Sequence, residues 1–327
     1  LSGRRSPVRG PHPSFAVALR ADPPPSPFHL PPRPPALAPP PPLPAAVLRE
    51  QLDGWLTRAA SAASFTAARE GPEVRAVIAP HAGYSYSGAT AAFAYLSLQA
   101  CGPAVRRVFV LGPSHHFHTP RCALSACRNY RTPLGDLPVD QGVYGELFAS
   151  GLFETMSPED DEAEHSLELQ LPYIRHVLGS RAGLTVVPIV VGALAPEAEE
   201  EFGRLLAPYL RSEENAVVVS SDFCHWGARF RYTFWDRSRG DIDESVEWLD
   251  REGMGIIERG DPEEFRAYLD DYRNTICGRH PIAVLLHMLR HCGTRHRTEF
   301  VRYAQSSRCK HPRDSSVSYA SAVVTKS

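Results

Sequence analysis

The sequence lacks the compositional features of a nucleic-acid-binding, membrane or disulfide-stabilised protein. Its 35 Lys plus Arg and 37 Asp plus Glu leave a formal net charge of -2, without the basic surplus that a general nucleic-acid binder needs to neutralise phosphates. No apolar run approaches the ~18 residues of a membrane-spanning helix, and the apolar stretch at residues 15–19 is too short for a signal-peptide core. Seven cysteines without paired spacing indicate reduced thiols. We therefore expect a soluble intracellular protein that binds no nucleic acid and has no membrane span.

Proline, in contrast, is abundant at one end of the chain. Sixteen of the 31 prolines lie in residues 1–44, including an unbroken run at 39–42. Because proline lacks an N–H and fixes φ, it is excluded from helix interiors and central strands. We interpret residues 1–47 as a disordered proline-rich tail and residues 48–327 as one folded domain. Such a tail also suits an SH3 or WW ligand, although it is more often simply solvated.

The folded part alternates strand-length apolar runs with helical patterns. The runs are rich in Val and Ile without alternating polar residues, as expected for strands buried on both faces: 75–79, 107–111, 184–191, 216–219 and 319–324. Between them lie helical patterns at 87–99, 164–178, 197–210, 242–257 and 281–289. Strands that alternate with helices predict an α/β fold, with a central, mostly parallel sheet flanked by helices.

Histidine follows three of these strands. His81 follows the first strand, His115 the second, and Asp222 and His225 the fourth. In open α/β sheets the ligand crevice lies outside the carboxyl ends of the strands, so these side chains can converge on one pocket. A single histidine near a strand end is more often a hydrogen-bonded structural residue, but three together favour a functional site.

Two further clusters can contribute to such a pocket. His165 and Glu168 open a predicted helix at positions i and i+3, and therefore lie on one face of it. Cys277 and His280 stand at a turn that precedes another helix. A helix N-terminus or a nearby histidine would lower the pKa of a thiol, although a lone cysteine is more often a small buried hydrophobic residue. We place His165, Glu168 and His280 around the predicted site.

Histidines, an acid and a thiol suit a transition metal such as Fe(II), Cu or Zn, whereas Mg and Ca prefer oxygen ligands. The spacing is not that of a zinc finger or of an H-E-x-x-H protease. Ligands gathered from distant strand ends indicate a preformed pocket with an open coordination position. We interpret the remaining histidines as solvated: His176, His287, His291, His296 and His311.

Longer motifs surround the candidate residues, in chain order. They are PHAGY at 80–84, GPSHH at 112–116, EHS at 164–166, SSDFCHW at 220–226, NTICGRHP at 274–281, YAQSS at 303–307 and DSSVSYA at 314–320. Together they resemble the Memo (mediator of cell motility) family. The resemblance runs from about residue 52 to the end of the sequence.

The resemblance implies a fold similar to that of the class III, non-haem iron extradiol dioxygenases, with a central sheet flanked by helices. It implies a cytoplasmic effector of receptor tyrosine kinase signalling, present also in the nucleus, that affects microtubules and cell motility. Such an effector binds phosphotyrosine peptides of receptors or adaptors. The resemblance further implies one iron or copper ion per chain, with metal-dependent redox activity in place of conventional dioxygenase activity.

Carried over to this sequence, the family's vestigial active site corresponds to His81, His115, Asp222, His225 and Cys277. His81, His115 and Cys277 would be the metal ligands, with Asp222 and His225 beside them, and the same five residues would contact a bound peptide. The family's His-Ala-Gly-Ser-Trp-Tyr segment, which supplies an aromatic wall, has no counterpart in the proline-rich tract. The resemblance therefore supports the metal site more fully than peptide binding.

Three functions remain open. The first, which we favour, is a signalling and metal-binding protein with a dioxygenase-like pocket. The second is an active redox enzyme or dioxygenase that uses the same pocket. Such oxygenases hold Fe(II) with two histidines and a carboxylate, whereas the third ligand here would be the oxidation-prone thiolate of Cys277. The third is a hydrolase with Cys277 as nucleophile and His225 as base, oriented by Asp222, which leaves His81 and His115 without a role.

Overall fold

The computed structural model describes residues 44–62 and 73–327. The predicted proline-rich tail, residues 1–47, lies outside the described residues except for its last four positions. The first described element, helix α1 (Ala45–Ala60), begins three residues before the predicted start of the domain. The tail and its use as an SH3 or WW ligand stay predictions.

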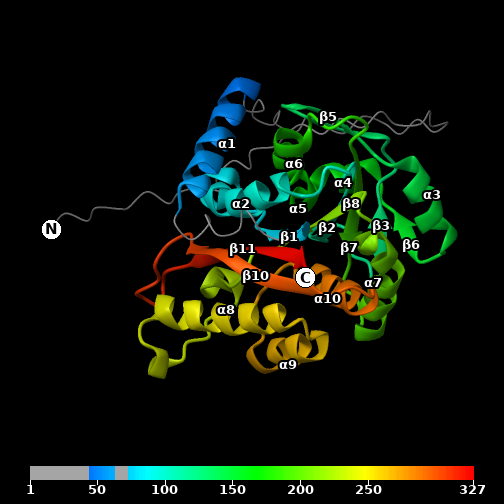
Figure 1. Cartoon of the computed structure of the whole chain (residues 1–327). Coiled ribbons are helices and arrows are strands. Elements are labelled where there is room, and N and C mark those ends of the chain that lie inside the picture. Colours follow the sequence, from blue (N-terminus) through cyan, green and yellow to red (C-terminus); the bar gives the residue numbers. More distant parts are fainter. Residues whose placement is uncertain (1–43, 63–72) are drawn as a thin grey trace, which may run out of the picture.

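A nine-stranded mixed sheet forms the centre of the described part of the chain, with helices on both faces (Figure 1). Its strands are β1 (Val74–Ala79), β2 (Arg107–Pro113), β3 (Cys122–Leu124), β6 (Phe153–Thr155), β7 (Thr185–Val191), β8 (Asn215–Ser220), β9 (His225–Trp226), β10 (His296–Gln305) and β11 (Ser316–Lys326). The central strands β1, β8, β2 and β7 lie in that order and are parallel. Antiparallel pairing continues the sheet through β11 and β10 on one side and β3 on the other. The predicted α/β fold with a central, mostly parallel sheet is confirmed.

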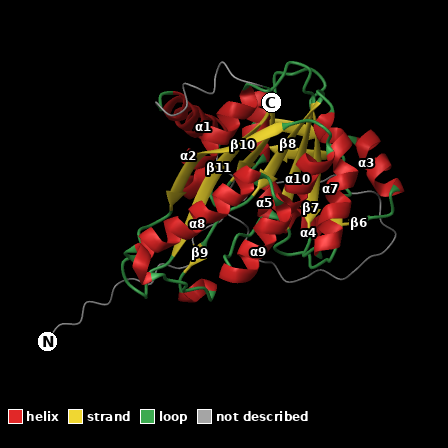
Figure 2. Cartoon of the chain, turned by 60° about the horizontal axis from the view of Figure 1, so that its bottom comes forward, coloured by secondary structure: helices red, strands yellow, loops and turns green. Residues whose placement is uncertain are grey.

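The central strands are mostly apolar and almost wholly buried because helices cover both faces of the sheet (Figure 2). Every residue of β1 and β8 is buried, and only the first residue of β2 and of β7 is partly exposed. One face carries α1, α2 (Tyr84–Gln99), α5 (His165–Glu168) and α6 (Leu171–Leu178). On the other side lie α7 (Pro196–Arg211), α8 (Ile242–Arg259), α9 (Pro262–Tyr272) and α10 (Arg279–His291). The remaining elements are β4 (Asn129–Thr132), β5 (Gly135–Pro138), α3 (Gln141–Ala149), α4 (Pro158–Ala163) and two short 3-10 turns, Ala228–Phe230 and Arg237–Arg239.

Each predicted strand and helix has a counterpart, but the helix expected at 164–178 is broken in two. Helix α5 ends at Glu168 and α6 begins at Leu171. In a continuous helix Pro172 would face the carbonyl of Glu168 without an N–H to donate, whereas in the first turn of α6 it is tolerated. The break leaves Gln170 between the two helices.

Two further expectations, on the cysteines and on His287, can be compared with the structure. All seven cysteines are free and six are buried, as expected for reduced thiols. The prediction that His287 is solvated is wrong, since this residue is only 6 % exposed. Helix α10 packs so closely against α7 that a Cβ on Gly203 would lie 2.2 Å from the Cβ of His287.

Within residues 44–62 and 73–327, none of the helices combines the length and the apolar character that a membrane crossing requires.

Candidate metal centre

The carboxyl ends of β1, β8 and β2 meet at one edge of the sheet, because these strands are parallel neighbours with β8 in the middle. His81 follows β1, Asp222 and His225 follow β8, and His115 follows β2. Cys277 reaches the same edge from the segment that leads into α10. The structure therefore brings together side chains that the sequence placed after separate strands.

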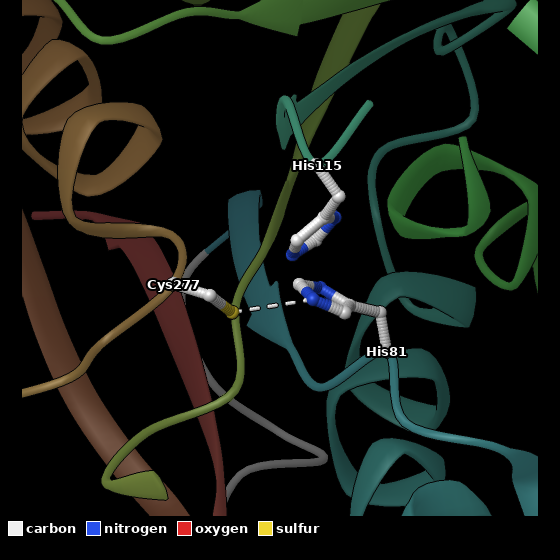
Figure 3. A group of neighbouring side chains, drawn as sticks. All are labelled: His81, His115 and Cys277. Carbon is white, nitrogen blue, oxygen red and sulfur yellow. Dashed lines mark hydrogen bonds between the residues drawn. The ribbon is translucent and has the colours of Figure 1, made fainter. Parts of the chain in front are cut away.

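Three of these side chains form a compact group (Figure 3). One possible ligand atom from each of His81, His115 and Cys277 lies within 4.8 Å of the other two. The Sγ atom of Cys277 is 3.2 Å from Nε2 of His81, and the ring centroids of His81 and His115 are 5.3 Å apart. His81 is buried, whereas His115 and Cys277 are partly exposed. We call these three residues the His–His–Cys group.

Close backbone packing positions Cys277. The N–H of Gly278 donates to Ser221 Oγ at 3.1 Å. A Cβ on Gly278 would lie 2.3 Å from the Cβ of Ser221 and 2.6 Å from the carbonyl oxygen of Ser220. Only glycine permits this approach. The N–H of Asp222 donates to Cys277 Sγ at 3.2 Å, which fixes the sulfur beside the histidines.

A buried carboxylate orients His115. Oε1 of Glu164 accepts from Nδ1 of His115 and from the N–H of Ser166, both at 2.9 Å. Oε2 accepts from the backbone N–H of His115 at 2.7 Å. Burial acts to raise the pKa of Glu164, but these hydrogen bonds and the charge of His115 outweigh it and lower the pKa to about 2. Glu164 was not among the predicted site residues, although its position next to His165 in the EHS motif could have indicated it.

A buried network orients His81. Its Nδ1 lies 2.8 Å from Ser220 Oγ, and Ser220 Oγ also contacts Gln170 Nε2 at 2.8 Å and the carbonyl oxygen of Ser166 at 2.7 Å. The backbone N–H of His81 donates to Asp222 Oδ1 at 2.9 Å. Ser220 and Gln170 were not among the predicted site residues, because neither residue type signals a metal site and no local spacing links them to His81.

His165, on α5, lies beside the His–His–Cys group. Its ring stacks on that of His115 with 4.4 Å between centroids, and lies 5.6 Å from that of His81. Burial, followed by the charge of His115, lowers the pKa of His165 to about 4. Burial and the neighbouring histidines also lower the pKa of His81. Both imidazoles are therefore neutral at physiological pH.

The geometry does not support the hydrolase hypothesis. The Nδ1 of His225 lies 2.9 Å from the backbone carbonyl of Phe223, and the imidazole that hydrogen-bonds Cys277 is His81. Burial, with the charge of Asp222 as the next cause, raises the pKa of the Cys277 thiol. The expectation of a lowered thiol pKa is therefore wrong, and a nucleophilic thiolate is disfavoured.

Two of the predicted surrounding residues make other contacts. His280 Nδ1 lies 2.6 Å from Glu199 Oε1 on α7. Glu168 is buried in α5, where its charge adds to the effect of burial in raising the pKa of Tyr84. Their place around a metal ion stays a prediction.

The donor chemistry of the His–His–Cys group fits a soft or borderline transition metal. Two imidazoles and a thiol that loses its proton on binding are ligands of copper, iron or zinc. A second set, His115, Glu164 and His165, also has possible ligand atoms within 4.8 Å of one another. Both oxygens of Glu164 already accept N–H hydrogen bonds, however. The His–His–Cys group is therefore the better candidate.

Known proteins resemble the chain over most of its length. A family model described as Memo-like protein matches residues 45–323. The chain is 50 % identical over 283 residues to Protein MEMO1 of Homo sapiens, covering 85 % of this chain and 92 % of that protein. It is 52 % identical over 278 residues to Protein MEMO1 of Xenopus tropicalis, covering 84 % and 90 %. Protein memo-1 homolog of Caenorhabditis elegans is 44 % identical over 285 residues, covering 85 % and 77 %. The crystal structure of an uncharacterized protein from Escherichia coli K12 aligns with a TM-score of 0.48 and 16 % identity, covering 76 % of this chain and 99 % of that one.

Proposed function

Since the chain belongs to the Memo family, we propose that it is an intracellular effector of receptor tyrosine kinase signalling and cell motility that holds one iron or copper ion. Family membership supports the effector role, exerted in the cytoplasm, with the nucleus as a second compartment and microtubules as a downstream target. The observation that carries the metal site is the meeting of His81, His115 and Cys277, from three separate segments, at one edge of the sheet.

The His–His–Cys group would hold the ion through two imidazole nitrogens and the sulfur of Cys277. A bound iron or copper ion supplies one-electron chemistry. The chain supplies orientation, since Glu164 holds the ring of His115 and Ser220 holds that of His81. The thiol proton of Cys277 must leave when the sulfur binds the metal.

Metal content of the purified full chain tests this proposal. After anaerobic loading with Fe(II) or Cu(I) and removal of free ion, we expect one ion per chain in the wild type and a loss of the ion in His81→Ala. His311→Ala changes an exposed histidine and serves as the matched control, which should keep the wild-type content. A wild-type chain without metal, or equal content in His81→Ala, would contradict the proposal.

We further propose that the partners are phosphotyrosine peptides of receptors or adaptors. The proposed contact residues are His81, His115, Asp222, His225 and Cys277. A phosphotyrosine side chain is an aromatic ring that carries a dianion, so neighbouring aromatic and cationic groups suit it. Beside the site, the ring of Phe230 lies 5.2 Å from that of His225, and the guanidinium of Arg229 lies 4.4 Å from the centroid of Phe230.

Fluorescence anisotropy with a labelled peptide tests this partner. The phosphotyrosine form is expected to bind more tightly than the unphosphorylated form, and Arg229→Ala is expected to remove that difference. Arg313→Ala, an exposed arginine on another loop, is the control and should preserve it. Equal affinity of the wild type for both peptides would contradict a phosphotyrosine partner.

The alternative is an active metal-dependent redox enzyme or dioxygenase that uses the same site. A thiolate in place of the usual carboxylate weighs against ring cleavage. The Fe(II)-loaded chain incubated with catechol and oxygen separates the two functions: we expect no ring-opened product. Formation of such a product by the wild type, and its loss in His115→Ala, would favour the enzyme.

A further inference from the structure

The hydrogen bonds around Ser220 determine which nitrogen of His81 carries the proton. The hydroxyl of Ser220 has one hydrogen, and it lies 2.7 Å from the carbonyl oxygen of Ser166, which can only accept. The Ser220 hydroxyl therefore donates its hydrogen to the carbonyl oxygen of Ser166. Ser220 Oγ must accept from its other neighbours, so Nδ1 of His81, at 2.8 Å, must be the donor.

The orientation of the Gln170 amide supports the same assignment. Its Nε2 lies 3.2 Å from the carbonyl oxygen of Pro80, which cannot donate, so this end of the amide is the NH₂ group. The same Nε2 donates to Ser220 Oγ at 2.8 Å. The other end, Oε1, accepts from the hydroxyl of Tyr95. Gln170, Ser220 and Tyr95 are fully buried, so water does not replace these bonds.

His115 is also protonated on Nδ1, but its hydrogen-bond acceptor is the carboxylate of Glu164. The two oxygens of Glu164 accept from the backbone N–H groups of His115 and Ser166, and Oε1 also lies 2.9 Å from Nδ1 of His115. A carboxylate has no hydrogen to give, so Nδ1 of His115 is the donor. In the neutral form of His115 the lone pair is thereby left on Nε2.

We propose that Gln170, acting through Ser220, and Glu164 are positioning residues of the metal centre, which hold His81 and His115 as Nδ1–H tautomers and leave both Nε2 lone pairs for the ion. The inference rests on the proposed metal binding. Gln170 would thus have a role at the metal centre although it is fully buried and acts only through Ser220. Without Ser220 the Nδ1–H of His81 would have no acceptor, and the proton would move to Nε2, where it blocks coordination.

The tautomers can be read directly by NMR of the metal-free full chain labelled with ¹⁵N-histidine. Long-range ¹H–¹⁵N correlations distinguish a protonated from an unprotonated ring nitrogen, and the His81→Ala and His115→Ala spectra assign the two rings. We expect Nδ1–H in both residues of the wild type. Ser220→Ala is expected to move the proton of His81 to Nε2 without changing His115, and Glu164→Gln to alter His115 alone.

Affinity for Cu(I) or Fe(II), measured by competition with a chelator, gives the second readout. Loss of an outer-shell partner costs roughly 10–100-fold in metal affinity, and we expect this for Ser220→Ala and Glu164→Gln. Gln170→Leu should cost less, because Ser220 still accepts from His81. Ser321→Ala is the matched control: Ser321 is a fully buried serine on β11 whose Oγ donates to the carbonyl of Thr90 at 2.8 Å, and its loss should leave affinity and tautomers unchanged.

The two readouts separate failure of this inference from failure of the proposed function. A wild-type spectrum with Nε2–H in His81 or His115 overturns the inference, even if Ser220→Ala proves too unstable to study. Wild-type affinity in both Ser220→Ala and Glu164→Gln also overturns it. A wild type that binds neither ion but shows both Nδ1–H tautomers contradicts the metal function, and with it the role proposed here for the hydrogen bonds.

Discussion

Cys277 Sγ lies 3.2 Å from His81 Nε2, although 196 positions separate the two residues in the chain. His81 arrives from the end of β1 and Cys277 from the turn before α10, so the contact depends on the packing of the whole domain. Burial raises the pKa of the thiol and lowers that of the imidazole. One proton therefore lies between Sγ and Nε2, on the sulfur, and a metal ion must displace it.

The first prediction concerns the choice of metal. Cys277→Ser replaces a soft sulfur by a hard oxygen, and thiolates select soft ions such as Cu(I). Loss of an outer-shell partner lowers metal affinity roughly 10–100-fold. For Cu(I), Cys277→Ser should lower the affinity by more than this, because it removes a direct ligand. For Fe(II), the same substitution should lower the affinity on the order of tenfold. Chelator competition under anaerobic conditions measures both. Cys309→Ser changes another buried cysteine and is the control; equal losses for the two ions in Cys277→Ser would argue against sulfur ligation.

The second prediction concerns the close approach behind Cys277. Gly278→Ala introduces a Cβ that would lie 2.3 Å from the Cβ of Ser221. The turn must move away from β8, so we expect destabilisation by about 1–3 kcal/mol, together with weaker metal binding. Urea unfolding and chelator competition measure the two effects.

A matched glycine supplies the control for this prediction. Gly145 lies within helix α3, and a Cβ there would meet nothing within 4 Å. Gly145→Ala should therefore stabilise the chain by about 0.5–1 kcal/mol and leave metal binding unchanged. If Gly278→Ala behaved in the same way, the close packing would not be what positions Cys277.

The parts of the site that follow strands could be predicted from the sequence. The strands before His81, His115 and Asp222 are largely apolar and rich in Val, and the rule that ligands bind at carboxyl ends of parallel strands brings these residues to one edge. The short strands β3 and β6 were not predicted, because three residues each are too few to show a period.

The residues that support the site could not be predicted, because their partners are distant in sequence. The contact between His81 and Ser220 spans 139 positions, and Gln170 owes its place to the helix break before Pro172. The pKa of Cys277 depends on two opposing effects, the nearby helix N-terminus and burial, and the sequence does not reveal which is larger. Its position before a helix predicted a lowered pKa, but burial has the larger effect and raises it.

The third prediction concerns a buried arginine that joins β1 to the end of α7. Arg75 is 1 % exposed, donates from Nη2 to the carbonyl oxygen of Leu210 at 2.8 Å, and pairs with Glu73 through Nη1. Arg75→Ala leaves this buried helix-end carbonyl unpaired, and each such group costs about 1–3 kcal/mol. We expect destabilisation by roughly 1–3 kcal/mol in urea unfolding. Arg75→Lys should recover only part of it, since an ammonium lacks the planar fork of a guanidinium.

Arg106 provides the surface comparison for Arg75. Its ion pair with Glu214 is largely exposed, and exposed pairs contribute about 0–1 kcal/mol. Arg106→Ala should therefore cost less than about 1 kcal/mol. Similar losses in Arg75→Ala and Arg106→Ala would show that burial of the guanidinium has no special effect.

The last prediction concerns stability against pH and rests on Asp250, which is fully buried in helix α8. Its Oδ1 accepts from the N–H of Cys224 at 3.2 Å and from Asn274 Nδ2 at 3.0 Å, and its Oδ2 accepts from the hydroxyl of Tyr303 at 2.9 Å. Burial outweighs these hydrogen bonds and raises the pKa of Asp250 from 3.8 to about 6. Between pH 3.8 and about pH 6, Asp250 is therefore protonated in the folded chain but ionised in the unfolded chain.

Because the folded state binds more protons in this window, the contribution of Asp250 to stability falls as pH rises from about 4 to about 6 and stays low above it. A shift of about two pKa units corresponds to roughly 3 kcal/mol. Asp250→Asn removes the titration, so the free energy of unfolding of the variant relative to wild type should rise by about 2–3 kcal/mol between pH 4 and pH 7. Urea unfolding of both chains at several pH values measures this difference. Parallel curves for the two chains would mean that Asp250 is ionised in the folded state throughout, and that its three hydrogen bonds, rather than its burial, determine its charge.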